Sequence, residues 1–67
     1  MGEREIEKTV LAIQGEALIC DRLRELGLFV GQQITILGRA PFAGPYLIQY
    51  NNTVLALREE EFQCLSL

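Results

Sequence analysis

The spacing of hydrophobic and polar residues changes several times along the chain, and each change marks a predicted element. Strands are expected where β-branched, aliphatic and aromatic residues cluster or alternate between turn residues. Ile34 and Ile36, for example, share one face of a segment and Thr35 lies on the other. Five short strands are predicted in this way, over residues 9–14, 33–39, 46–50, 53–58 and 62–67.

One helix is predicted between the first two strands, over residues 16–26. Ile19, Leu23 and Leu26 stand at positions i, i+4 and i+7, which places them on one helix face. Gly27 supplies the left-handed residue that commonly follows a helix C-terminus. The segment has no Ser, Thr, Asp or Asn at its start, so its end is better defined than its beginning. A single further helical turn is predicted at residues 59–61.

Turn residues connect these elements. Residues 41–45 read Pro-Phe-Ala-Gly-Pro and predict a loop, while Asn51 and Asn52 tolerate the positive φ of a tight hairpin turn. Gly38 lies inside a predicted strand and indicates a β-bulge or a sharp bend. Five strands with one short helix after the first strand predict a mainly β fold, a small and partly open barrel.

Length and charge narrow the classes of function. The 67 residues predict one domain, residues 1–67. Six basic residues against nine acidic ones give a net charge of −3, which argues against binding to nucleic acid or an anionic membrane. No apolar run is long enough to cross a bilayer, so we expect a cytoplasmic protein without direct membrane insertion. In that reducing compartment Cys20 and Cys64 are expected as buried thiols.

The sequence offers little for catalysis or metal binding. It contains no His, the commonest general base and metal ligand, and no glycine-rich phosphate loop. We therefore predict that the chain is not an enzyme and carries no cofactor. The only carboxylate cluster is Glu59, Glu60 and Glu61, and adjacent side chains point in different directions. It predicts a solvated acidic turn, with no catalytic and no metal site.

The aromatic residues divide into two groups. Tyr46 and Tyr50 share one face of a predicted strand, a pattern that some barrels use to stack single-stranded nucleic acid. The basic rim of such a site is missing here, so packing within the fold is favoured. Phe29 and Phe42 fall in predicted turns beside Gly or Pro. Aromatics in loops either fold back onto the core or face a partner, and the sequence leaves both open.

The order of several short motifs resembles the FeoA family. The helix end at residues 22–28 reads Arg-Leu-Arg-Glu-Leu-Gly-Leu, followed by a Val-Gly turn and an Ile-Thr-Ile strand. The remaining matching pieces are the Ala-Pro pair 40–41, Pro45, the Ala-Leu-Arg of residues 56–58, Glu61-Phe62 and the apolar ending 65–67. One departure is that the family's loop reads Pro-Leu-Gly-Asp-Pro, whereas here Gly44 stands in place of the Asp.

The resemblance implies an SH3-like barrel and a small accessory protein of bacterial ferrous iron uptake. It also implies a partner, the membrane iron transporter FeoB, which carries a cytosolic GTPase domain. The protein would then be cytoplasmic and peripheral to the inner membrane through this partner. The resemblance leaves open whether such a protein stimulates GTP hydrolysis, gates transport or supports assembly. A weak homo-oligomer also stays open.

An interaction protein of this kind needs a contact surface. We expect it at the helix end and the two aromatic loops, formed by Leu26, Leu28, Phe29 and Phe42 and positioned by a buried Leu23. The alternative is a weak Fe²⁺ sensor or carrier that uses carboxylate ligands, since oxygen ligands suit hard divalent ions. A module that binds proline-rich peptides ranks last, because the chain has no Trp for an aromatic groove.

Overall fold

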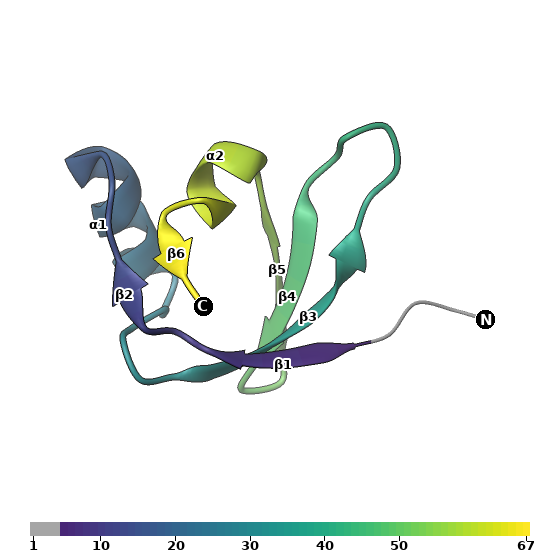
Figure 1. The fold of residues 1–67 in the computed structure, drawn as a ribbon, viewed down its shortest axis with the longest axis horizontal. Helices are drawn as coiled ribbons and strands as arrows, with labels where there is room; N and C mark the ends of the chain where they lie inside the picture. Colours follow the sequence, from purple (N-terminus) through teal and green to yellow (C-terminus); the bar gives the residue numbers. More distant parts are fainter. Residues whose placement is uncertain (1–4) are drawn as a thin grey trace.

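The computed structural model describes residues 5–67, so residues 1–4 of the predicted domain lie outside the described part. A four-stranded antiparallel sheet in the order β1-β3-β4-β5 forms one side of the fold, and a two-stranded pair, β2-β6, forms a second (Figure 1). The elements are β1 (Ile6–Thr9), β2 (Ala12–Ile13), α1 (Ala17–Glu25), β3 (Gln33–Arg39), β4 (Tyr46–Tyr50), β5 (Thr53–Leu57), α2 (Glu59–Phe62) and β6 (Leu65–Ser66).

The prediction of a mainly β, partly open barrel is confirmed. β3 and β4 have the predicted bounds, while α1 is one residue shorter than predicted at each end and β5 is one residue shorter at its C-terminal end. The large sheet does not close on itself, and α1 and α2 stand beside it with the β2-β6 pair (Figure 1). Every strand pair is antiparallel. The loops of residues 26–32 and 40–45 lie at opposite ends of β3.

The prediction of one strand over residues 9–14 is wrong, because the segment divides between the two sheets. The Val10 N–H donates to the Gln32 carbonyl at 2.9 Å, which ends the pairing of β1 with β3. One residue on, the Leu11 N–H donates to the Ser66 carbonyl at 2.7 Å and begins the pairing with β6. Strand propensity showed that this segment is extended, but it carries no information on which partner each residue takes.

The last predicted strand, residues 62–67, is also shorter in the structure. Phe62 ends α2, and only Leu65–Ser66 pair with β2. The Glu61 carboxylate accepts a hydrogen bond of 2.9 Å from the Arg58 N–H and so supports the start of α2. Such a contact satisfies a backbone donor at a helix N-terminus. It favours a full helical turn over immediate extension into a strand.

The C-terminus of α1 is a Schellman motif, and it decides where the next residue goes. Gly27 has a φ of +103°, as the sequence predicts, and its N–H donates to the Arg24 carbonyl at 3.0 Å. The Leu28 N–H then donates to the Leu23 carbonyl at 3.1 Å. This motif commonly packs the residue after the glycine onto the last helical turn. Both leucines are completely buried here.

Two further turn signals are confirmed. Ile36 pairs with Ile48 and Gly38 with Leu47, so Leu37 is the extra residue of a β-bulge next to the predicted glycine. In the β4-β5 turn both central residues, Asn51 and Asn52, have positive φ, as two-residue hairpins require.

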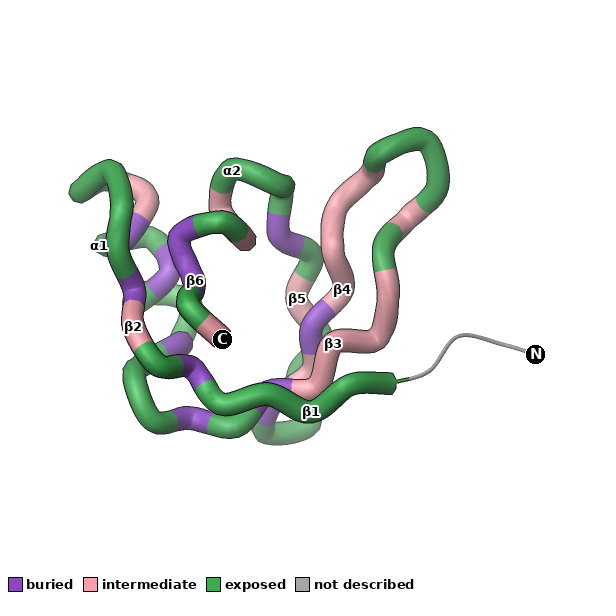
Figure 2. Tube along the Cα trace, in the orientation of Figure 1, coloured by how far each residue is buried: buried purple, intermediate pink, exposed green. Residues whose placement is uncertain are grey.

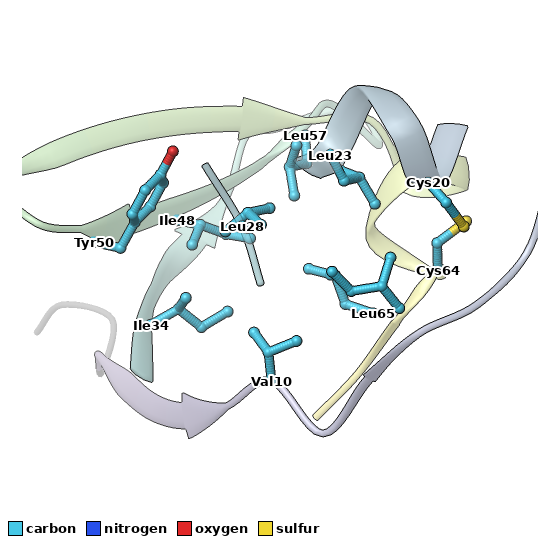
Figure 3. Close-up of a cluster of buried hydrophobic side chains, with 11 residues drawn as sticks. Val10, Cys20, Leu23, Leu28, Ile34, Ile48, Tyr50, Leu57, Cys64 and Leu65 are labelled. Atoms are coloured by element: carbon cyan, nitrogen blue, oxygen red, sulfur yellow. The ribbon is translucent and has the colours of Figure 1, made fainter. Parts of the chain in front are cut away.

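The core lies between the large sheet, α1 and the β2-β6 pair. Figure 2 shows buried positions in the large sheet, in α1 and in the β2-β6 pair. Figure 3 shows their side chains converging; the fully buried ones are Val10, Leu23, Leu28, Ile34, Ile48 and Leu57. Tyr50 is buried beside them, and its hydroxyl donates to the Leu26 carbonyl at the end of α1. Neither helix within residues 5–67 has the length and apolar character of a membrane span.

Candidate interaction surface

Phe42, at the tip of the β3-β4 loop, is the most exposed large hydrophobic residue of the described chain. Its side chain is 100% exposed. Phe42 and Ala43 have φ of 60° and 57°, and the Gly44 N–H donates to the Pro41 carbonyl at 3.2 Å across them. A bulky residue in the left-handed region is uncommon and unfavourable. The ring therefore contributes no burial energy to the fold, and its backbone conformation lowers the stability of the fold.

Arg39 holds this loop in place. Its Nε donates to the Gly44 carbonyl at 3.0 Å, and its guanidinium also reaches the Ala43 carbonyl at 3.5 Å. The same group donates to a Glu59 carboxylate oxygen at 2.8 Å, which joins the loop to α2. The Ala40 N–H closes the loop base on the Pro45 carbonyl at 2.9 Å. Phe42 is thus presented by an anchored loop, which lowers the ordering cost of binding.

Two stacked aromatic rings pack against Arg39. The Arg39 guanidinium lies 4.6 Å from the centre of the Tyr46 ring, and Tyr46 stacks on Phe62 with ring centres 4.1 Å apart. Tyr46 thus packs within the fold, and Tyr50 is buried in the core, as the packing interpretation of these two residues expects. Sequence reasoning missed Arg39. Its signal was an arginine at a strand end, directly before a loop rich in Pro and Gly.

A second apolar patch follows the end of α1. Leu26 is 37% exposed and Phe29 is 57% exposed, and the neighbouring Val30 is exposed as well. The turn is held from inside by Gln32, whose side-chain oxygen accepts a hydrogen bond of 3.4 Å from the Phe29 N–H. Val30 was not among the predicted residues. Its signal was its position beside Phe29 and before a turn glycine.

Leu28 does not belong to any surface, and its placement in the contact surface is corrected. Its side chain is only 1% exposed, because the Schellman motif turns it back onto Leu23. The prediction that Leu23 is buried is confirmed. Leu23 and Leu28 therefore set the position of Leu26 and Phe29 from within the core.

The two aromatic loops do not form one surface. Phe29 precedes the start of β3, and Phe42 follows its end. Seven residues of extended strand span about 20 Å, and Figure 1 shows the two loops at opposite ends of β3. The predicted single contact surface is thus divided into the Phe42 loop (residues 40–45) and the helix-end patch (Leu26, Phe29 and Val30).

The acidic residues of α2 are turned toward different partners. Glu59 pairs with Arg39, whereas a Glu61 carboxylate oxygen lies 3.5 Å from the Arg22 Nε on α1. Within residues 5–67 no three His, Cys, Asp or Glu side chains come together as a metal site would require. The Glu59 and Glu61 carboxylates therefore attach α2 to β3 and α1.

A pocket of about 400 Å³ lies where α1, the end of β5 and α2 meet. The exposed Leu18 and the half-buried Ile19 contribute its apolar part, and two arginines and two glutamates its charged part. Its full lining is Leu18, Ile19, Arg22, Ala56, Arg58, Glu60 and Glu61. Because Arg22 and Glu61 pair with each other, the pocket has no strong preference for one sign of charge.

The two cysteines are buried free thiols, as the sequence predicts. Burial raises the pKa of the Cys64 thiol above its ordinary value, and the neighbouring Cys20 adds to the shift. Cys64 therefore rests as a thiol at neutral pH. Its Sγ donates to the Glu60 carbonyl at 3.5 Å.

Comparison with known proteins identifies the family. A family model for the FeoA domain matches residues 7–67. The solution structure of a FeoA-like protein from Clostridium acetobutylicum superposes with a TM-score of 0.79 at 25% identity, covering 88% of this chain and 69% of that one. Comparison with curated proteins gives no significant match.

A second solved structure agrees. It is the crystal structure of Stenotrophomonas maltophilia FeoA complexed with zinc, described as an SH3 domain protein that possibly acts as a ferrous iron transport activating factor. The TM-score is 0.75 at 31% identity, with 90% of this chain and 75% of that one covered. The domain match over nearly the whole chain and the shared SH3-like fold lead to one conclusion: this chain belongs to the FeoA family.

Proposed function

We propose that this chain is an accessory protein of ferrous iron uptake that acts by binding the membrane iron transporter FeoB on its cytosolic GTPase side. Membership of a family of small accessory factors in ferrous iron transport supports the general role. The protein acts in the cytoplasm and reaches the inner membrane through this partner. Its task is recognition, so the chemistry of GTP hydrolysis and ion passage belongs to the transporter.

The observation that carries the proposal is the anchored Phe42 loop. An isolated soluble domain gains nothing from a fully exposed phenylalanine held in a left-handed conformation. Both features are explained if the ring enters a pocket on a partner, because aromatic anchors dominate the binding energy of many interfaces. Strained residues of this kind concentrate at functional sites. Arg39 fixes the ring in advance.

The helix-end patch is the second contact in this proposal. Its exposed residues Leu26, Phe29 and Val30 lie within one stretch of five residues, which contains the Schellman turn. Since the patch and the Phe42 loop lie at opposite ends of β3, a single partner must span the length of that strand to touch both. A GTPase domain, much larger than this chain, is long enough to do so.

The experiment measures binding of the purified chain to the isolated cytosolic domain of FeoB, with and without guanine nucleotide. Phe42→Ala is expected to weaken binding by more than about 1 kcal/mol, as removal of an aromatic anchor does. Val54→Ala is the matched control, because Val54 is also exposed and apolar but lies on β5 and belongs to neither patch. Phe29→Ala tests the second contact in the same assay.

Two outcomes would decide against the proposal. If FeoB does not bind the unmodified chain in either nucleotide state, the partner is wrong. If FeoB binds but Phe42→Ala and Phe29→Ala both bind as well as Val54→Ala, the partner stands and the surface is wrong. Capture from detergent-solubilised membranes of iron-starved cells, followed by mass spectrometry, checks that the transporter is retained from its natural setting.

A further inference from the structure

Cys20 and Cys64, far apart in the sequence, lie side by side in the fold. Cys20 is on α1, and Cys64 directly follows α2. Figure 3 shows their side chains pointing toward one another at the edge of the core. Both are free thiols and both are buried. The function proposed above makes no use of this pair.

The chain around Cys64 contacts its sulfur on two sides. A Cβ placed on Gly15 would lie only 2.6 Å from the Cys64 Sγ, so the sulfur is packed against the chain just before α1. On its other side the thiol donates to the Glu60 carbonyl at 3.5 Å. We propose that Cys20 and Cys64 are a modification site, at which an oxidant of the hydroperoxide class converts the two thiols into an intramolecular disulfide.

The reaction balances with one hydroperoxide. One thiol gives up its proton and its sulfur attacks the peroxide O–O bond, which breaks to leave a sulfenic acid. The released oxygen takes up that proton and leaves as an alcohol, or as water when the oxidant is hydrogen peroxide. The second thiol attacks that sulfur, so the S–S bond forms and a water molecule leaves. Two S–H bonds are lost, and the two electrons that the thiol pair gives up reduce the peroxide.

The disulfide would connect α1 to the segment after α2. It would close a loop of about 45 residues, long enough for such a link to restrict the unfolded chain strongly. Because α1 and α2 both line the pocket described above, the disulfide also fixes the distance between its two walls. The oxidation state of the pair thus determines how far these helices can separate.

The first experiment uses the full chain, reduced, desalted and treated with equimolar hydrogen peroxide. Remaining thiols are alkylated in denaturant, and the protein is cut with trypsin without reduction. Cleavage after Lys8, Arg22 and Arg58 places the two cysteines in peptides 9–22 and 59–67. We expect these peptides to be recovered as one cross-linked species from monomeric protein. Recovery of both as alkylated peptides, or a link only between two chains, would overturn the proposal.

The second experiment asks whether the fold itself brings the sulfurs together. The chain is equilibrated with reduced and oxidised glutathione, once under native conditions and once in urea. The equilibrium constant for disulfide formation should be about tenfold or more larger in the native chain, because the fold then holds the thiols in place. A native constant no larger than that in urea would show that the folded geometry opposes the bond and would overturn the proposal.

The variants Cys20→Ala and Cys64→Ala separate the pair from general oxidation. Each single variant should lose the intramolecular link and keep one thiol that is alkylated in denaturant or is found in dimers. Circular dichroism before oxidation checks that the variants fold. If one of them does not, the comparison of the native and urea equilibria in the unmodified chain still decides the matter.

Discussion

Two turns of this small barrel each have two consecutive non-glycine residues with positive φ, but the residue types differ. In the β4-β5 turn, Asn51 and Asn52 have φ of 47° and 62°. In the β3-β4 loop, Phe42 and Ala43 have φ of 60° and 57°. Asparagine is among the few residues that visit this left-handed region readily, whereas phenylalanine and alanine do so at a cost.

The difference separates a turn suited to folding from the loop that we propose for binding. The β4-β5 turn follows the local rule and carries no large side chain. The β3-β4 loop breaks that rule and carries a fully exposed ring, and Arg39 provides contacts that keep it in place. Local rules of sequence and structure are expected to fail mainly at functional sites. The predictions below test whether the β3-β4 loop is such a site.

The largest effect is expected when the Phe-Ala pair of the β3-β4 loop is placed in the β4-β5 turn. The double variant Asn51→Phe with Asn52→Ala should lower the free energy of unfolding by about 2–4 kcal/mol, since each residue would occupy the left-handed region at a cost of about 1–2 kcal/mol. Urea unfolding measures the loss. Asn52→Gly is the control that preserves turn chemistry. An unchanged midpoint in the double variant would remove strain as an argument for Phe42.

The next effect concerns the anchor. Arg39→Leu should lower the free energy of unfolding by about 1–2 kcal/mol, because it removes the hydrogen bonds to Glu59 and the loop carbonyls and the contact with Tyr46. It should also weaken FeoB binding by freeing the loop. Arg39→Lys keeps the charge but lacks the planar guanidinium, so its free energy of unfolding should lie between those of the unmodified chain and Arg39→Leu. Equal stability of all three proteins would exclude Arg39 as the anchor.

A third variant should move stability and binding in opposite directions. Phe42→Asn removes the ring, so FeoB binding should weaken by more than about 1 kcal/mol. The same change should raise the free energy of unfolding by about 0.5–1 kcal/mol, because asparagine accepts the left-handed conformation better. Calorimetric binding and urea unfolding on the same samples measure both. A loss of stability together with binding would indicate that the ring serves the fold instead.

The smallest effect compares the second positions of the two turns. Ala43→Gly should stabilise the chain by about 0.5 kcal/mol, because glycine is free of the left-handed penalty but loses more conformational freedom on folding. Asn52→Gly should change the free energy of unfolding by a few tenths of a kcal/mol at most, since asparagine already adopts the left-handed conformation readily. The melting temperatures of the two variants, measured at the same pH, compare these effects. Equal shifts would mean that the two turns do not differ in strain.

Much of the fold could be predicted from short-range patterns. The bounds of β3 and β4, the helix face with Leu23, the bulge next to Gly38 and the turn at Asn51 and Asn52 all follow from residue types within a few positions of each other. Such features depend on backbone preferences and on periodicity, which are local properties. The FeoA resemblance rested on the same short motifs, and the family match confirms it.

The candidate site was less predictable, because its residues meet through long-range contacts. Leu28 and Phe29 are neighbours in one turn, yet one is buried and the other exposed, since the left-handed Gly27 returns only Leu28 to the helix. Arg39 and Glu59 form their ion pair across 20 positions of sequence, so neither residue alone indicated the anchor.

The sequence by itself determined a small mainly β barrel, its helix, its turns and its family, because propensity, periodicity and turn chemistry act between near neighbours. Only the tertiary structure decided which sheet residues 9–14 join, that Phe29 and Phe42 lie at opposite ends of β3, and that Cys20 faces Cys64. Those outcomes depend on packing between segments distant in the chain, which no local pattern records.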